Sequence, residues 1–187
     1  MNGRFDIRET PLEGLKCLVR KPLWDARGFL ERLFCAEELA CLAEGESFVQ
    51  INRTLTREAG TIRGFHYQLP PHAETKWVTC LRGRVFDVAV DLRTESPTFL
   101  QWHGEELGGE NGKTMVIPKG FSHGFQTLQE DCEMLYFHST AYCAEAEFGF
   151  NALDPRMAIT WPLQVTDQSE RDKCLPLLLK DFAGITL

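Results

Sequence analysis

The stretch KWVTCLRGRVFDVAVDLR, residues 76–93, determines the expected fold class. Two runs rich in β-branched and aromatic residues, 76–82 and 84–93, flank a turn at Arg82-Gly83. In the second run apolar residues recur at every second position, which is the period of a strand whose two faces differ. One face holds Phe86, Val88, Val90 and Leu92, and the other holds Asp87 and Asp91. The stretch therefore predicts two successive β-strands.

The same alternation of short strands and turns continues from residue 48 to about 150. Before it, CAEELACLAEG at residues 35–45 is expected to be a helix, because Ala, Glu and Leu are good helix formers. Near the end, the cap-like Ser169 is expected to begin a short helix that Pro176 limits. Many short strands with one or two peripheral helices predict a single all-β domain over residues 1–187, a sandwich or a barrel.

The composition limits the classes of function. The chain has 187 residues, 43% of them hydrophobic, and a net charge of −7. An acidic chain argues against a nucleic-acid-binding protein, although a local cluster of Arg and Lys can still bind a small anion. Since no run of about 18 apolar residues occurs, no membrane span is expected. The start, MNGRFDIRET, lacks the apolar core of a signal peptide.

The seven cysteines indicate a reducing compartment. Their number is odd and no Cys-x-x-Cys pair occurs, so neither a disulfide framework nor a zinc site is favoured. Free thiols in a cytoplasmic protein are the expected state.

A second stretch, GTIRGFHYQLPPHAETKW at residues 60–77, gathers the side chains that could carry chemistry. Strict alternation places Gly64, His66 and Gln68 on one face of a strand. Arg63 faces away from them unless Gly64 forms a bulge, which glycine commonly does. A neutral histidine on an interior face is a good base near neutral pH.

Lys76 shares one face of the following strand with Val78 and Cys80. A lysine that faces a barrel interior is costly unless it meets an anion, such as a phosphate or an oxyanion that forms during a reaction. A second small pattern, IPKGFSHGF at residues 117–125, places His123 after a Pro-x-Gly turn. Two strand–turn units with histidines are how a double-stranded β-helix presents its interior.

The same residues allow two kinds of chemistry. His66, Glu74 and His123 could hold a metal as two histidines and a carboxylate, although Lys76 would compete with the ion. The second kind, metal-free proton transfer, is favoured. Taken singly, each residue has an ordinary structural explanation: Tyr136 in the core and Asp172 as a charge at a helix start. The remaining histidines show no pattern and are expected to be structural: His72, His103 and His138.

The chain resembles a known family in motifs spread over most of its length. They are DARGF, FVQIN, GTIRGFHYQLPP, KWVTCLRGRVFDVAVDLRTESPTF, MVIPKGFSHGFQTL, LDPRMAITWPL and SERD. With these motifs, from about Leu12 to Leu175, the sequence resembles the dTDP-4-dehydrorhamnose 3,5-epimerases, cupin-fold dimers of deoxysugar biosynthesis. The resemblance implies an all-β cupin fold, a double-stranded β-helix or jelly-roll barrel.

The resemblance also implies a reaction without metal or redox cofactor on a nucleotide-linked 4-keto-6-deoxyhexose. The C4 ketone acidifies the protons on C3 and C5, and His66 would remove such a proton. Asp172 would hold the imidazole and stabilise its charged form. Lys76 would stabilise the enolate oxygen. Tyr136 would return a proton from the opposite face and so invert the centre.

Substrate-binding residues and a dimer follow from the same resemblance. Arg27 would reach the site of the neighbouring subunit through a swapped N-terminal strand. The expected substrate-binding residues are Arg27, Gln50, Asn52, Arg63, His123 and Tyr142. The expected partners are thus a nucleotide sugar and a second copy of the chain, with no nucleic acid and no membrane.

Several positions depart from the family pattern. Arg32 stands where a glutamate is usual, Ile51 interrupts the usual Gln-Asp-Asn, and Phe137 replaces a frequent lysine. Ala152-Leu153 replaces an aromatic residue and an asparagine. These departures leave room for an epimerase of a single centre, C3 or C5, or for one that acts on a CDP- or GDP-linked ketosugar. A metal-dependent cupin enzyme and a non-catalytic sensor of a sugar nucleotide also stay open.

Overall fold

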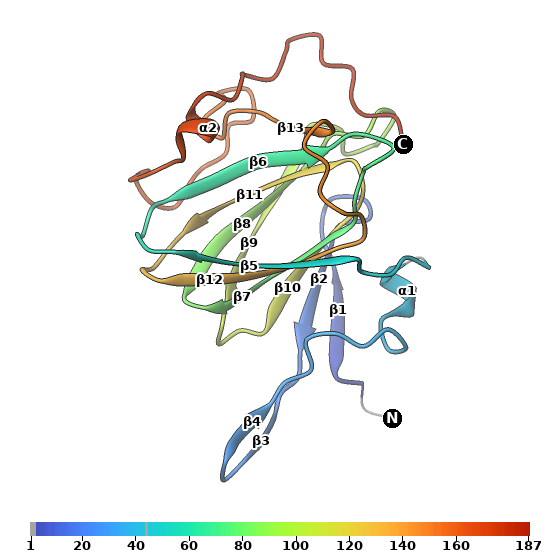
Figure 1. Ribbon diagram of the computed structural model, residues 1–187, viewed down its shortest axis with the longest axis vertical. Helices are drawn as coiled ribbons and strands as arrows, with labels where there is room; N and C mark the ends of the chain where they lie inside the picture. Colours follow the sequence, from blue (N-terminus) through green and yellow to red (C-terminus); the bar gives the residue numbers. More distant parts are fainter. Residues whose placement is uncertain (1–2, 44) are drawn as a thin grey trace.

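The computed structural model describes residues 3–43 and 45–187, and it confirms the all-β prediction (Figure 1). One sheet contains, in spatial order, β1 (Phe5–Glu9), β2 (Lys16–Arg20), β10 (Lys113–Ile117), β7 (Lys76–Arg82), β12 (Cys132–His138) and β5 (Gln50–Thr56). The other contains β13 (Glu147–Gly149), β6 (Ile62–Gln68), β11 (Phe121–Thr127), β8 (Arg84–Asp91) and β9 (Trp102–Gly108). All pairings within these sheets are antiparallel, and the two sheets form a cupin-type jelly-roll barrel.

The two strands predicted on either side of Gly83 are both present, but they do not pair with each other. β7 pairs with β10 and β12, whereas β8 pairs with β9 and β11 in the opposite sheet. The chain crosses from one sheet to the other at Gly83, which has a φ of +77°. Apolar side chains of both sheets fill the barrel between them, among them Val78, Cys80, Val85, Ala89, Leu107, Met115, Phe125 and Met134.

The outer faces of both sheets are covered as well. Val88, Val90 and Leu92, on the face that the alternation predicted, pack against the C-terminal segment. That segment contributes Phe150, Ala152, Met157, Leu178 and Ile185. On the other sheet Trp77 and Phe137 pack against residues 33–48, so the central strands are buried on both sides.

The expected helix over residues 35–45 is wrong in extent. α1 spans only Ala40–Ala43, turns precede it, and Glu44 lies outside the described residues. Leu39 is fully buried against the outer face of the sheet while Glu38 is exposed. A segment this short gains little from its own helical hydrogen bonds, so it follows the surface that its buried side chain covers.

The helix expected after Ser169 is confirmed. α2 spans Glu170–Lys173, and the Ser169 hydroxyl accepts a hydrogen bond from the backbone N–H of Asp172 at 3.1 Å. This is the standard N-cap contact, which satisfies an otherwise unpaired amide. No helix in the described part of the chain is long and apolar enough to cross a membrane.

All seven cysteines carry free thiols. Burial raises the pKa of Cys17 to about 11 and that of Cys80 to about 12. Since the thiolate is the reactive form, these two side chains act as small apolar core residues.

The hairpin of β3 (Leu23–Asp25) and β4 (Gly28–Leu30) extends away from the barrel, on the side opposite α2 (Figure 1). At its base the buried Arg20 lies 3.0 Å from a carboxylate oxygen of Glu31. The guanidinium also donates to the hydroxyl of Thr114 at 2.6 Å. The hairpin is therefore attached to the barrel by buried polar contacts at its base.

Phe65 of β6 packs against the C-terminal segment that covers the outer face of its sheet. This contact gives a stability prediction. The Phe65 ring is fully buried and stacks on Phe150 with centroids 4.8 Å apart. We expect Phe65→Ala to lower the free energy of unfolding by about 3–5 kcal/mol, measured by urea denaturation. Phe148→Ala, at a half-exposed ring on the adjacent strand, is the control and is expected to cost less than about 1 kcal/mol. Equal losses in the two variants would contradict this packing.

Candidate active site

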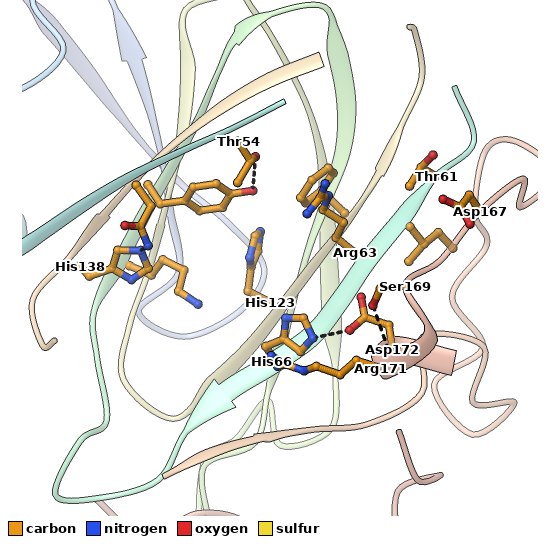
Figure 2. A pocket seen from close by; sticks show the side chains of 15 residues that line it. Thr54, Thr61, Arg63, His66, His123, His138, Asp167, Ser169, Arg171 and Asp172 are labelled. Atoms are coloured by element: carbon orange, nitrogen blue, oxygen red, sulfur yellow. Dashed lines mark hydrogen bonds and ion pairs between the residues drawn. The ribbon is translucent and has the colours of Figure 1, made fainter. Parts of the chain in front are cut away.

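A cavity of about 410 Å³ opens between the two sheets (Figure 2). β6 and β11 supply one wall, β5, β7 and β12 supply the other, and α2 lies at its edge. Of the residues expected to act on substrate, seven line this cavity: Asn52, Arg63, His66, Lys76, His123, Tyr136 and Asp172.

His66 and Asp172 form a hydrogen-bonded pair on the β6 side of the cavity. Nε2 of His66 lies 2.8 Å from Oδ1 of Asp172 (Figure 2). The backbone N–H of Gly64 donates to Oδ2 of the same carboxylate at 3.2 Å. Burial opposes the ionisation of Asp172. The hydrogen bond with His66, the positive charge of that ring when it is protonated, and the hydrogen bond from the Gly64 amide outweigh burial and lower the pKa of this carboxyl below its ordinary value. An ionised carboxylate only accepts, so Nε2 carries the hydrogen and Nδ1 is left to take a proton.

The strand is irregular at Gly64, which is the condition under which Arg63 joins the side of His66, and both side chains line the cavity. The partner residues on β11 change register between His123 and Phe125, opposite His66 and Arg63. Gly64 has a φ of +114°, and a side-chain Cβ there would lie 2.6 Å from the carbonyl oxygen of His123. Only glycine fits both the backbone conformation and this approach. The Nε of Arg63 donates to the hydroxyl of Thr56 at 2.9 Å.

Tyr136 lies on the opposite sheet from His66, on β12. Its hydroxyl is 3.5 Å from Oγ1 of Thr54, and burial raises the pKa of this phenol well above its ordinary value. The phenol therefore stays protonated at all physiological pH values. An imidazole with a free ring nitrogen and a protonated phenol thus face the cavity from different walls.

The ammonium of Lys76 is paired with a carboxylate of the same chain, that of Glu74. Its Nζ lies 3.1 Å from Oε1 of Glu74, and both side chains are largely buried. Burial opposes the charge of Glu74, but Lys76 and a hydrogen bond from His138 lower the pKa of the carboxyl. The ammonium is thus held at the cavity wall before any ligand binds.

The three residues considered as metal ligands are not gathered around one point. His66 binds Asp172, Glu74 binds Lys76 and His138, and Nε2 of His123 lies 2.7 Å from Oδ2 of the fully buried Asp87. Among the residues that the structure describes, no group of three or more His, Cys, Asp or Glu side chains could hold a metal ion. Each of the three has another hydrogen-bonding partner instead.

Two residues of the site were missed by the sequence analysis. Asp87 is assigned by the alternation only to the second face of its strand, although it lies on β8 beside β11 and bonds to His123 there. His138 was expected to be structural, but it lines the cavity and its Nδ1 lies 2.6 Å from Oε2 of Glu74. Its position two residues after Tyr136 places both on the same face of β12.

A smaller cavity of about 170 Å³ adjoins the first and contains the expected residues Gln50 and Tyr142. The side-chain oxygen of Gln50 accepts the backbone N–H of Tyr142 at 3.0 Å, and the Tyr142 hydroxyl donates to Glu147 at 2.7 Å. Glu147 also pairs with Arg171 of α2 at 2.7 Å. An exposed aromatic ring held by its hydroxyl is well placed for stacking on a flat ligand group.

Arg27 is the one expected site residue that the structure places outside both cavities. It lies in the β3–β4 hairpin, its side chain is 90% exposed, and it pairs with Asp25 at 2.6 Å. The positions that depart from the family pattern lie outside the cavities too: Arg32, Ile51, Phe137, Ala152 and Leu153. Phe137 faces away from the barrel, where it packs beside Trp77.

The lowered pKa of Asp172 predicts how stability depends on pH. Its carboxylate stabilises the fold above its ordinary pKa of about 4, and this contribution is lost as the pH falls through the lower folded-state value. We therefore expect the free energy of unfolding of Asp172→Asn to fall less steeply between about pH 4 and pH 2 than that of the unmodified protein. Urea denaturation at several pH values measures both curves, and parallel curves would contradict the coupling.

Comparison with known proteins identifies relatives along most of the chain. The family model described as dTDP-4-dehydrorhamnose 3,5-epimerase matches residues 9–180. The dTDP-4-dehydrorhamnose 3,5-epimerase of Pseudomonas aeruginosa is 45% identical over 152 residues, which cover 80% of this chain and 82% of that protein.

Solved structures agree with the sequence comparison. The dTDP-4-dehydrorhamnose 3,5-epimerase of Bacillus anthracis, with TDP and PPi bound, matches with a TM-score of 0.90 and 39% identity over 93% of this chain and 99% of that chain. The dTDP-6-deoxy-D-glucose-3,5-epimerase of Legionella pneumophila, in complex with dTDP-4-keto-L-rhamnose, matches with a TM-score of 0.88 and 41% identity over 92% of each chain. The chain therefore belongs to the dTDP-4-dehydrorhamnose 3,5-epimerase family, a family of isomerases.

Proposed function

We propose that this chain epimerises C3 and C5 of a dTDP-4-keto-6-deoxyhexose by metal-free proton transfer. The observation that carries the proposal is the arrangement of the cavity, where the His66–Asp172 pair faces Tyr136 across the barrel. Four of the departures from the family pattern, at Ile51, Phe137, Ala152 and Leu153, lie outside both cavities of this chain, and Arg32 follows the hairpin that carries Arg27.

The first step is removal of a carbon-bound proton. The C4 ketone makes the protons on C3 and C5 acidic, and His66 takes one of them on Nδ1. Asp172 keeps its charge because of its lowered pKa and stabilises the imidazolium that forms. The electron pair moves to the C4 oxygen as an enolate, which the ammonium of Lys76 stabilises. Such an interaction contributes roughly 3 kcal/mol to the transition state.

The second step returns a proton from the other side of the sugar. Tyr136 gives its phenolic proton to the same carbon, the enolate returns to the ketone, and the centre is inverted. Solvent then restores the proton on Tyr136 and removes the one on His66. The raised pKa of Tyr136 keeps the donor protonated until it reacts.

The remaining site residues would bind the nucleotide. Arg63 and His123 line the larger cavity with the catalytic groups, and Arg63 is proposed to contact the diphosphate. Asn52 lines both cavities, while Gln50 and Tyr142 belong to the smaller one. We propose that the Tyr142 ring contacts the sugar nucleotide from the smaller cavity, which His66 and Lys76 also line.

The proposed active form is a homodimer. The β3–β4 hairpin extends away from the barrel (Figure 1). It exposes Trp24, Phe29 and Leu30, apolar side chains that another surface would cover. Arg27 lies in this hairpin and does not line the cavity of its own chain. We therefore assign Arg27 to the cavity of the second copy, reached through the exchanged N-terminal segment.

The proposed compartment is the cytoplasm. All seven cysteines have free thiols, a state that a reducing compartment maintains. A nucleotide-activated sugar is also made where nucleoside triphosphates are available, which agrees with the same compartment.

Proton exchange in D₂O tests the roles of His66 and Tyr136. With dTDP-4-keto-6-deoxyglucose, we expect proton NMR to show loss of both the C3 and C5 signals. His66→Asn should slow both exchanges by about 10²–10⁴-fold. Tyr136→Phe should still exchange protons on the His66 side, because the base is intact, but should no longer invert the centres.

A different outcome of this experiment would assign a different function. Loss of a single signal indicates a single-centre epimerase. Exchange only with a CDP- or GDP-linked ketosugar reassigns the nucleotide. Unchanged exchange in His66→Asn contradicts the assigned base, and activity that requires a stoichiometric metal contradicts metal-free transfer. Tight dTDP-sugar binding without any exchange indicates a sensor.

Mixing two inactive variants tests the exchange of Arg27. Arg27→Ala lacks the arginine and His66→Asn lacks the base, so each should be slow alone at limiting substrate. In a hybrid dimer, the Arg27→Ala chain keeps its own His66 and receives Arg27 from its partner. Random mixing then makes about a quarter of all sites intact, and about that share of the wild-type rate should return. No recovery in verified hybrids would place Arg27 at its own site.

A further inference from the structure

A continuous polar network lies on the β5–β7–β12 wall, and the proposed proton transfers do not use all of it. His138 lies across the cavity from Asp172, and its side chain is 11% exposed (Figure 2). Its Nδ1 is 2.6 Å from Oε2 of Glu74, and its Nε2 is 3.4 Å from Nδ2 of Asn52. The other oxygen of Glu74, Oε1, is 3.1 Å from Nζ of Lys76. Four side chains are thus connected from Asn52 to Lys76.

The donors and acceptors fix the direction of this network. The amide nitrogen of Asn52 only donates, so Nε2 of His138 accepts. Nδ1 then carries the hydrogen that the Glu74 carboxylate accepts. Both ring nitrogens of His138 and both oxygens of Glu74 are consequently engaged.

Glu74 is paired with both Lys76 and His138. Its hydrogen bond with His138 limits how far the carboxylate can neutralise the charge of Lys76. A lysine ammonium is a compact charge on a flexible stem, so its position depends on the anion that it meets. A carboxylate with one unpaired oxygen would rotate toward the ammonium and neutralise more of its charge. The imidazole of His138 holds the second oxygen, so the carboxylate cannot turn in this way.

We propose that Glu74 and His138 are positioning residues for Lys76. His138 fixes the Glu74 carboxylate, and the carboxylate holds the ammonium where the enolate oxygen forms. The inference rests on the proposed function, because the enolate belongs to that reaction. Stabilisation of a developing charge depends on a group being in place beforehand, so a displaced ammonium lowers turnover rather than affinity for the substrate.

Two substitutions of His138 separate this role from simple packing. His138→Leu keeps most of the volume and removes both hydrogen bonds, whereas His138→Gln keeps a donor and an acceptor. For exchange of the C3 and C5 protons, we expect kcat of His138→Leu to fall roughly 10- to 100-fold with KM within about twofold. His138→Gln should recover most of this loss.

His103→Leu is the matched control, since His103 lies 3.5 Å from Glu105 on β9 and outside both cavities. It should keep the wild-type kcat. Equal impairment of His103→Leu and His138→Leu would overturn the proposal, as would a His138→Leu protein that loses dTDP affinity as much as turnover. Thermal unfolding confirms that each variant is folded.

A double-mutant cycle tests whether His138 acts through Lys76. If it does, combining His138→Leu with Lys76→Ala makes the enzyme no slower than Lys76→Ala alone. If the losses in kcat of the two single variants multiply in the double variant, the proposal is overturned.

The position of Lys76 can also be followed without turnover. After ¹³C-methylation of the lysines, the Lys76 signal, assigned with Lys76→Arg, should shift in His138→Leu and stay in place in His103→Leu. An unchanged signal would overturn the inference. This measurement tests the inference even if the protein exchanges no substrate protons. Absence of proton exchange would contradict only the proposed function.

Discussion

The hydrogen bond between His66 and Asp172 is the contact on which the site depends, and it joins residues 106 positions apart in the chain. Its carboxylate comes from α2, a helix of four residues that cannot hold its own place. The C-terminal segment, which packs on the outer face of the five-stranded sheet, holds α2 beside β6. Phe65, next to His66, stacks on Phe150 of that segment, and their backbones exchange two hydrogen bonds of 3.2 Å. The outer core layer and the His66–Asp172 pair are therefore structurally connected.

Burial by itself raises the pKa of each acidic group of the cavity, and the partners of the group decide the net direction. Burial raises the pKa of Tyr136, which has only a weak partner in Thr54, and so keeps the phenol protonated. Asp172 and Glu74 are buried too, yet histidine and lysine partners lower the pKa of each carboxyl. The partner of each group, rather than its depth alone, decides whether it acts as an acid or as a fixed charge.

Successive side chains of each strand point alternately to the cavity and to the outer layer, and this alternation positions these groups. His138 and Tyr136 face the cavity from β12, while Phe137 between them packs outward on Trp77. The crossing at Gly83 sends β7 and β8 to opposite sheets, so Lys76 and the Asp87–His123 pair approach the interior from different sides. Side chains that depart from the family pattern fall in the outer layers or on the surface, outside the lining that this chain gives to its own cavities.

The sequence by itself determined the features that arise from neighbouring residues. It predicted the β-strands, the apolar face of β8 and the helix start at Ser169, and it marked Gly64 as a position that permits a bulge, because period, capping and glycine conformation are local properties. The tertiary structure alone decided which sheet each strand joins, the short extent of α1, and the contacts of Asp87 and His138. Those depend on which distant side chain completes a buried hydrogen bond or covers an apolar face, and such pairings become defined only when the two sheets close around the cavity.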